Sequence, residues 1–187
     1  MIKKWMTGIG LLLVTFFWMA CGNGNDSTNN KATTDSAAAA PQQDTVSVTP
    51  VAGVVLKEDA LNAIYIHYMR LTDALTAGEV AAARIAGSAI EAGAANIPGG
   101  AGLARTAAGI MAAGDIETQR TAFAALSEDF IALVKKSGLQ RGTLYVDFCP
   151  MAMNDKGAYW LSANKVISNP YFGAEMLTCG EVKTTIQ

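Results

Sequence analysis

Two stretches of the chain place their large apolar residues at the spacing of one helical face. Between Lys57 and Thr76 these residues are Leu61, Ile64, Tyr65, Tyr68, Leu71 and Leu75. Between Asp115 and Gly138 they are Ile116, Phe123, Leu126, Phe130, Leu133 and Val134. Residues three and four apart share one face of an α-helix, so both stretches predict amphipathic helices. Each apolar face needs a partner, so the chain must fold around packed helices.

The segment between these two helices is rich in Ala and Gly and predicts two more. Residues 76–79, Thr-Ala-Gly-Glu, have the form of a capping box, so we expect a second helix from Ala77 to about Asn96. Its large apolar positions are Val80, Ile85 and Ile90. Residues 97–100, Ile-Pro-Gly-Gly, end this helix because Pro and paired Gly do not continue one. A short third helix over Leu103–Ala113 follows.

Residues rich in β-formers follow Gly138. Thr143–Phe148 predicts a strand between Gly142 and Pro150, and Ala158–Leu161 predicts a weaker one. The expected fold class is therefore mainly α, a three- to four-helix bundle with a small C-terminal lobe of short β-strands and ordered loops. We assign it to residues 55–187, about 130 residues, which suffice for one modest core.

The first 20 residues have the features of a lipoprotein signal peptide. Lys3 and Lys4 precede an uncharged apolar run over residues 8–19, and Ala20 precedes Cys21. A run of about 12 residues is too short to cross roughly 30 Å of hydrocarbon as an uncleaved anchor. We therefore expect cleavage before Cys21 and lipid attachment to that residue. Because Gly22 is not Asp, we expect an envelope protein anchored in the outer membrane and facing the periplasm.

Residues 21–54 predict a flexible tether. They are dominated by small and polar residues with no aromatic side chain, so they cannot bury enough apolar surface to offset their ordering entropy. Their spaced valines, at 46, 48 and 51, form at most a loose extended strap. Of the chain's 14 basic residues, two lie in the signal peptide, which leaves 12 against 16 acidic residues. A mildly acidic mature chain lacks a basic stripe, so we expect no nucleic-acid binding.

The chemically distinctive side chains lie between residues 149 and 179. They are two cysteines and three methionines: Cys149, Met151, Met153, Met176 and Cys179. Thiolates and thioethers select soft ions such as Cu(I) and Ag(I). If the strand extends through Met151, that side chain points to the same side as Cys149, and a turn supplies Met176 and Cys179. These four residues form the predicted metal site, with Met153 as a reserve ligand.

The residues alone leave other interpretations open. Cys149 and Cys179 could instead form a structural disulfide whose loop of about 30 residues stabilises the fold by roughly 3 to 4 kcal/mol. The methionines would then be ordinary core residues. In that alternative the domain is a non-enzymatic envelope interaction module. Its aromatic segment then makes either core or a partner surface: Tyr159, Trp160, Pro170, Tyr171 and Phe172.

Four short blocks in this region resemble a known family. They are residues 149–152 (Cys-Pro-Met-Ala), 157–162 (Gly-Ala-Tyr-Trp-Leu-Ser), 169–173 (Asn-Pro-Tyr-Phe-Gly) and 176–180 (Met-Leu-Thr-Cys-Gly). In this order they resemble the bacterial domain of unknown function 3347. That family occurs in periplasmic lipoproteins and in adaptor subunits of copper and silver efflux pumps. The resemblance spans about residues 55–185 and implies heavy-metal handling, with an efflux adaptor as a possible partner. Family members often carry His before the first Cys, where this chain has Phe148.

No pattern predicts catalysis, so we expect no catalytic residues and no enzyme. The one histidine, His67, lies off the best apolar stripe of its helix and is interpreted as solvent-facing or hydrogen-bonded. Asp147 and Asp155 are two isolated carboxylates, too few for a calcium site, and are interpreted as solvated loop residues. The glycines of the helical segment are interpreted as helix contacts and a turn: Gly87, Gly93, Gly99 and Gly102.

Overall fold

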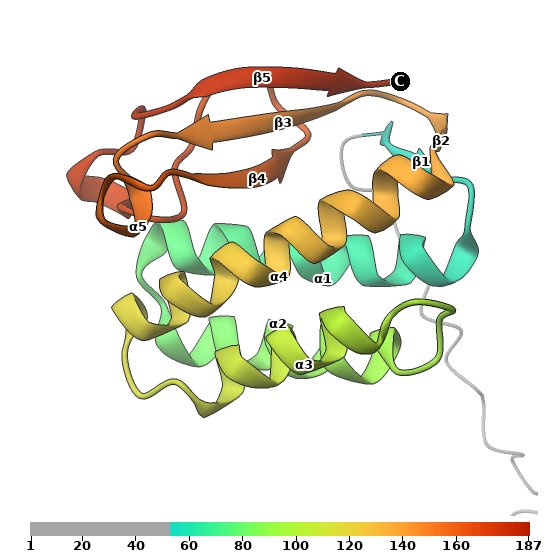
Figure 1. Cartoon of the computed structure of the whole chain (residues 1–187), viewed down its shortest axis with the longest axis horizontal. Helices are drawn as coiled ribbons and strands as arrows, with labels where there is room; N and C mark the ends of the chain where they lie inside the picture. Colours follow the sequence, from blue (N-terminus) through green and yellow to red (C-terminus); the bar gives the residue numbers. More distant parts are fainter. Residues whose placement is uncertain (1–52) are drawn as a thin grey trace, which may run out of the picture. The chain divides into compact units, whose positions relative to one another are not determined.

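The computed structural model describes residues 53–187 (Figure 1). The predicted signal peptide, the predicted lipidation site Cys21 and nearly all of the predicted tether lie outside these residues. The described chain is buried almost from its start, because Val54 is only 2% exposed. Within residues 53–187, no helix combines the length and the apolar character needed to cross a membrane.

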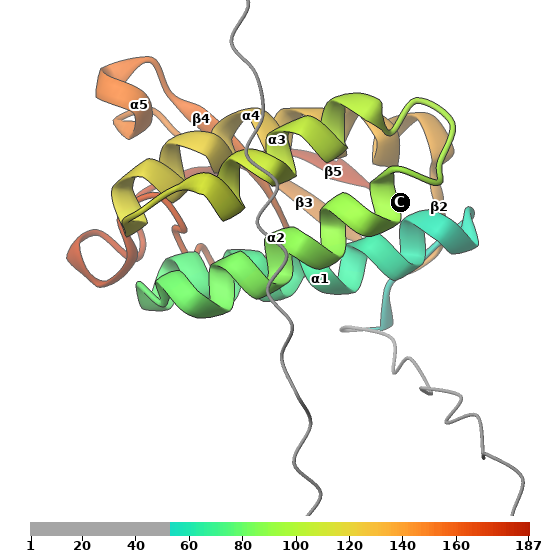
Figure 2. The ribbon, with the colours of Figure 1, turned by 90° about the horizontal axis from the view of Figure 1, so that it is seen from below.

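Four antiparallel helices form a bundle, as the periodicity predicts. They are α1 (Asp59–Ala77), α2 (Val80–Ala94), α3 (Ala101–Ala112) and α4 (Ile116–Ser137). Helices α1 and α4 form one layer and α2 and α3 the next (Figure 1). Seen from below, α2 lies alongside α1 and α3 alongside α4 (Figure 2). The predicted apolar face of α1 is buried along its whole length, at Leu61, Ile64, Tyr65, Tyr68, Leu71 and Leu75.

Most of the predicted helix boundaries are confirmed. Asp115 caps α4 by accepting a hydrogen bond from the backbone N–H of Thr118 over 2.9 Å, and Gly138 follows its last residue. The capping box at residues 76–79 is wrong. Helix α1 continues through Ala77 and ends at Gly78, whose left-handed conformation (φ 76°) brings the N–H of Glu79 onto the carbonyl of Ala74. The side chain of Glu79 makes no capping bond, and α2 begins only at Val80.

Glycines on α2 allow close helix contacts, as interpreted from the sequence. A Cβ atom at Gly93 would lie 2.9 Å from Cγ1 of Ile64 on α1, and one at Gly87 would lie 3.1 Å from Cβ of Ile110 on α3. Both distances are shorter than ordinary van der Waals contact. Of the large apolar positions of α2, Ile90 is fully buried, but Ile85 is 74% exposed.

A small sheet covers the α1 and α4 layer on the side away from α2 and α3 (Figure 1). Its central strand is β3 (Leu144–Cys149), flanked by β4 (Ala158–Ser162) and β5 (Glu181–Ile186), both antiparallel to it. The first two strands confirm the predicted β segments, whereas β5 was not predicted. A separate pair, β1 (Val55–Leu56) and β2 (Leu139–Arg141), ties the start of the domain to the segment after α4. The short turn α5 (Ala152–Asp155) follows β3.

Aromatic side chains make one core out of the bundle and the sheet. On the bundle side, the Tyr68 ring stacks on Phe130 with 4.6 Å between centroids and also contacts Phe123. Tyr171, from the segment between β4 and β5, lies 5.5 Å from Phe123 and 5.9 Å from Trp160 of β4. Packing of this kind contributes beyond simple area burial, so the C-terminal lobe is an integral part of the domain.

Candidate thiol and metal centre

The structure brings Cys149 and Cys179 into contact. Their Sγ atoms are 3.1 Å apart, although the residues are 30 positions apart in the chain. A disulfide bond is about 2.05 Å long, so the two sulfurs meet as free thiols. The residues differ in burial, because Cys149 is fully buried and Cys179 is partly exposed. The pair is the part of the predicted metal site that the fold assembles.

Strand β3 positions Cys149. It is the last residue of the strand, directly opposite Ala158 on β4. Because side chains alternate along a strand, Cys149 shares a face of β3 with Asp147. The next residue, Pro150, lacks a backbone N–H and cannot continue the ladder. The thiol therefore sits where the sheet ends, beneath the segment that carries Cys179.

Hydrogen bonds to the main chain position Cys179. Its N–H donates to the carbonyl of Met176 over 3.1 Å, and its carbonyl accepts from Nδ2 of Asn169 over 2.7 Å. Asn169 is itself fully buried, and its Oδ1 accepts from the N–H of Tyr171 over 2.8 Å. Its own N–H donates to the carbonyl of Leu177 over 2.8 Å. One asparagine thus holds both sides of the turn that presents Cys179.

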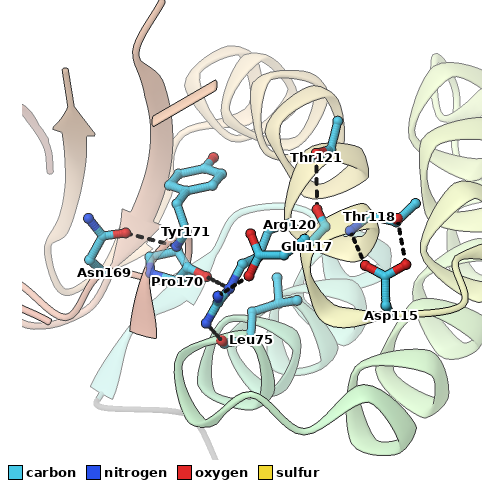
Figure 3. A network of polar contacts seen from close by, with 9 residues as sticks. All are labelled: Leu75, Asp115, Glu117, Thr118, Arg120, Thr121, Asn169, Pro170 and Tyr171. Atoms are coloured by element: carbon cyan, nitrogen blue, oxygen red, sulfur yellow. Dashed lines mark hydrogen bonds and ion pairs between the residues drawn. The ribbon is translucent and has the colours of Figure 1, made fainter. Parts of the chain in front are cut away.

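Arg120 of α4 ties this segment to the bundle (Figure 3). Its Nε donates to the carbonyl of Pro170 and its Nη2 to the carbonyl of Leu75 at the end of α1, each over 3.0 Å. Its Nη1 pairs with Glu117 at 2.6 Å, and its side chain is only 9% exposed. Sequence reasoning missed Arg120, although a signal exists. The residue lies four after Ile116 and three before Phe123, on the apolar face of α4.

The predicted methionine ligands are less well gathered. Strand β3 ends at Cys149, so the expected extended Cys149–Met151 pair does not form. Met151 instead has near-helical backbone angles after Pro150 and is 49% exposed. Met176 is partly buried and shares a turn with Cys179 through the hydrogen bond described above.

Met151 and Met153 line a groove of about 620 Å³ between α4 and the segments that follow β3 and β4. Neither cysteine lines this groove. Helix α4 contributes Glu117 and Thr121 to the same groove. Met153 begins three consecutive left-handed residues, which are rare for side chains other than glycine. The two thioethers therefore lie on a segment of unusual backbone conformation, at a place separate from the thiols.

The aromatic segment belongs mainly to the core. Trp160 is fully buried and Tyr171 is 3% exposed, with its hydroxyl donating to the carbonyl of Tyr159 over 2.6 Å. Pro170 is buried, and Phe172 is partly buried. Only Tyr159 is exposed, at 37%. Of the two roles considered for these residues, core is thus the one that the structure supports for most of them.

Asp147 corrects the interpretation of the two isolated carboxylates. Asp155 is exposed, as expected, but Asp147 lies within β3 and is fully buried. Neither of its carboxylate oxygens has a hydrogen-bond partner. Burial disfavours the charged form, which raises the pKa of Asp147 from 3.8 to about 7. The alternation of side chains along a strand does not distinguish a buried acid from an exposed one. For this reason the sequence led us to interpret Asp147 as a solvated residue.

The thiol pair has its own electrostatic signature. The hydrogen bond with Cys149 raises the pKa of the Cys179 thiol, and partial desolvation adds to that effect.

His67 lies elsewhere, partly buried on α1, where desolvation and then the charge of Arg70 lower its pKa. Among residues 53–187, no three His, Cys, Asp or Glu side chains converge in a way that could hold a metal ion.

Comparison with protein families gives one match. The family model described as "Protein of unknown function (DUF3347)" matches residues 64–142, which run from α1 to the end of β2. This supports the resemblance drawn from the sequence, but over the helical part. The four C-terminal blocks on which that resemblance rested lie beyond the matched residues. No curated protein and no solved structure matches the chain.

Proposed function

We propose that this domain binds a soft monovalent metal ion, Cu(I) or Ag(I), through Cys149 and Cys179. In this proposal it acts without catalysis, as a buffer or as a metal donor. The observation that carries the proposal is the 3.1 Å contact between the two Sγ atoms. Soft ions prefer thiolate sulfur to hard oxygen donors, and this contact supplies two thiols at one place. The partial exposure of Cys179 supplies a route for the ion from solvent.

The geometry fits such an ion after a small movement. Metal–thiolate bonds are about 2.3 Å long, so two sulfurs that share one ion lie about 4 Å apart. The thiols must therefore separate by about 1 Å. Cys179 is the residue able to move, because it is partly exposed in a turn while Cys149 is enclosed at the end of β3. In this proposal the opening comes from a movement of Cys179, which lies outside the strands of the sheet.

Met176 is the methionine best placed to add a third ligand. It shares the turn of Cys179 and is only partly buried. Met151 and Met153, in contrast, line the groove that excludes both cysteines. In this proposal Met151 is an exposed thioether outside the dithiol site, and Met153 remains a reserve ligand.

The cellular setting of the proposal comes from residues outside the described part. A lipid on Cys21 would anchor the chain to the outer membrane, facing the periplasm. The resemblance to proteins linked with copper and silver efflux suggests an efflux adaptor as the acceptor of the ion. Both statements rest on the sequence and on the family resemblance.

The rival function keeps the same two cysteines. If Cys149 and Cys179 form a disulfide, the domain is an interaction module whose C-terminal lobe is covalently closed. The observation that favours it is the same short contact, because closing by about 1 Å would form the bond. Mass spectrometry of the non-reduced protein separates the two functions. Loss of two hydrogen atoms, assigned to these cysteines in protein isolated from cells, favours the module.

The test is an anaerobic Cu(I) titration against a competing chelator. The protein is the full chain carrying Cys21→Ser, so that only the two described thiols remain, and both are first reduced. We expect tight one-to-one binding that is lost when Cys149→Ser and Cys179→Ser are combined. Unchanged affinity in that double variant, with its fold verified by circular dichroism, would contradict the proposal.

Methionine variants refine the same titration. Met176→Leu removes the thioether closest in sequence to Cys179, so we expect weaker Cu(I) binding. Met111→Leu is the matched control, because Met111 lies on α3, and the layer of α2 and α3 is on the side of the bundle away from the sheet (Figure 1). Equal affinities of the two variants would exclude Met176 from the ligand set while leaving the dithiol site intact.

A further inference from the structure

We propose that Cys179 is a site of thiol–disulfide exchange and that Cys149 is its resolving thiol. An external disulfide would first form a mixed disulfide with Cys179, and Cys149 would then displace it to close the Cys149–Cys179 bond. This reaction needs no metal and does not depend on the function proposed above. The evidence is the short distance between the sulfurs combined with their unequal exposure.

Burial decides which sulfur reacts first. Cys149 is 0% exposed, and its surroundings are equally closed, with Ala158 at 2% and Ala152 at 1%. An external disulfide must approach the attacking sulfur directly, so it cannot reach Cys149 in the folded chain. Cys179 is partly exposed in the turn that follows Met176. The first covalent step is therefore confined to Cys179.

The backbone around Cys179 keeps its sulfur close to Cys149 for the second step, the attack of Cys149 on the mixed disulfide. The hydrogen bond from Asn169 Nδ2 holds the carbonyl of Cys179, and Gly180 follows against the sheet. A Cβ atom at Gly180 would lie 2.9 Å from the Trp160 ring and 3.0 Å from the carbonyl oxygen of Phe148. The chain after Cys179 therefore runs in close contact with β3 and β4. A sulfur held there remains within reach of Cys149 after it has been modified.

The chemistry balances with a low-molecular-weight disulfide, R–S–S–R, as oxidant. The Cys179 thiol loses its proton to solvent, and its thiolate attacks one sulfur of R–S–S–R. The R–S–S–R bond breaks, and RS⁻ leaves and takes a proton from solvent. Cys149 then loses its proton and attacks Sγ of Cys179, releasing the second RS⁻, which is also protonated. The protein dithiol is oxidised by two electrons, and the disulfide is reduced to two R–SH.

The exchange also regulates the proposed metal site, and this consequence alone rests on the proposed function. The thiols at 3.1 Å lie between two arrangements, a bond of about 2.05 Å and a metal-bridged separation of about 4 Å. A pair closed as a disulfide offers no thiolate to an ion. Oxidation and metal binding are therefore mutually exclusive, and reduction restores the site.

The test uses the metal-free full chain carrying Cys21→Ser, treated with oxidised glutathione without oxygen. Mass spectrometry with peptide mapping follows the products over time. We expect a transient glutathionyl group on Cys179 and then an internal disulfide, with both steps faster at higher pH. A glutathionyl group found on Cys149 at rates comparable to Cys179, or no internal disulfide after complete reaction of Cys179, would overturn the proposal.

Two single variants give independent readouts. Cys149→Ala, which keeps an apolar residue in the core, should stop at a stable mixed disulfide on Cys179. Cys179→Ser should react at least about tenfold more slowly, because the remaining thiol is enclosed. Equal rates for the two folded variants would contradict the assignment. Because no metal is present, failure of Cu(I) binding would leave these results unaffected, and the reverse also holds.

Discussion

The phenolic oxygen of Tyr68 on α1 accepts a hydrogen bond from the backbone N–H of Leu161 on β4 over 3.0 Å. The same oxygen lies 2.7 Å from Oγ of Ser127 on α4, within hydrogen-bond distance. One fully buried hydroxyl thus joins the two inner helices to the nearest strand of the sheet. Because buried polar groups are costly when unpaired, each of the three partners depends on the other two.

Removing the Tyr68 hydroxyl should therefore destabilise the domain. Tyr68→Phe leaves the Leu161 N–H without an acceptor, and we expect the free energy of unfolding to fall by about 1 to 3 kcal/mol. Chemical denaturation followed by circular dichroism measures the change. Tyr65→Phe is the matched control, because the hydroxyl of Tyr65 is buried without a partner and its removal should be neutral or stabilising. Equal losses in both variants would contradict this account.

The buried Asp147 should make the stability of the metal-free protein depend on pH. Its pKa rises from 3.8 to about 7 on folding, so the folded state holds the proton to higher pH than the unfolded state. The contribution of this group to stability is then full below about pH 4 and is lost as the pH rises through about 7. We expect the free energy of unfolding to decrease between about pH 4 and about pH 7 and to level off above that.

Asp147→Asn should flatten this pH profile and raise stability near pH 8, because it removes the charge that burial disfavours. Asp155→Asn provides the control, since Asp155 is exposed and should leave the slope unchanged. The measurement is urea denaturation at each pH. An identical slope in wild type and Asp147→Asn would show that another group sets the pH dependence.

Gly157 should not tolerate a side chain. It has a φ of 77°, which side chains rarely adopt, and a Cβ atom there would overlap the ring of Phe148 on β3. We expect Gly157→Ala to lower the free energy of unfolding by more than about 1 kcal/mol. Gly114→Ala is a suitable comparison, because Gly114 has open space around its Cα. A thermal melt of both variants decides the matter, and a neutral Gly157→Ala would refute the close contact.

Cu(I) affinity should increase with pH. Thiols must lose their protons to bind the ion, and the contact with Cys149 raises the pKa of Cys179. Each proton displaced gives about a tenfold rise in apparent affinity per pH unit while the thiol is protonated. Chelator competition at several pH values, corrected for the chelator's own protonation, measures the slope. An affinity that does not change with pH would mean that Cu(I) displaces no proton from Cys179.

Arg120 should control the order of the segment that presents Cys179. Arg120→Met leaves the carbonyls of Leu75 and Pro170 without their donor. We expect faster amide hydrogen exchange over residues 169–179, with the bundle core less affected. Arg105→Met, on an exposed position of α3, is the control. Unchanged exchange in this segment would indicate that Asn169 alone maintains its order.

The sequence predicted those parts of the fold that depend on a regular pattern of side chains. The apolar faces of α1 and α4 follow the helical period, and β3 and β4 are rich in β-formers between turn residues. Strand β5 was missed because nearly all its side chains are exposed and only Val182 and Ile186 are partly buried. It is held by its pairing with β3, which no local pattern encodes.

The site was predicted in its residue types better than in its geometry. Both sequence-based alternatives, the metal site and the disulfide, brought Cys149 and Cys179 together, and the fold places their two sulfurs in contact. Met151 was expected on an extended strand, but the strand stops at Pro150, so its side chain turns toward solvent. Arg120 and Asp147 are ionisable residues that the fold buries. The partners of Arg120 lie in distant segments of the chain, and Asp147 has no hydrogen-bond partner, so neither environment can be predicted from the local sequence.

The order of the sheet has a consequence for how the chain matures. Helices α1 to α4 pack mainly against their neighbours in sequence and can assemble as soon as residue 137 is available. Strand β3, by contrast, receives one of its two flanking strands from the final residues, Glu181–Ile186. During synthesis, which proceeds from the N-terminus, Cys149 emerges well before its partner. The Cys149–Cys179 contact therefore cannot form until the chain has been made through Cys179, when the residues of all four bundle helices are already available to fold.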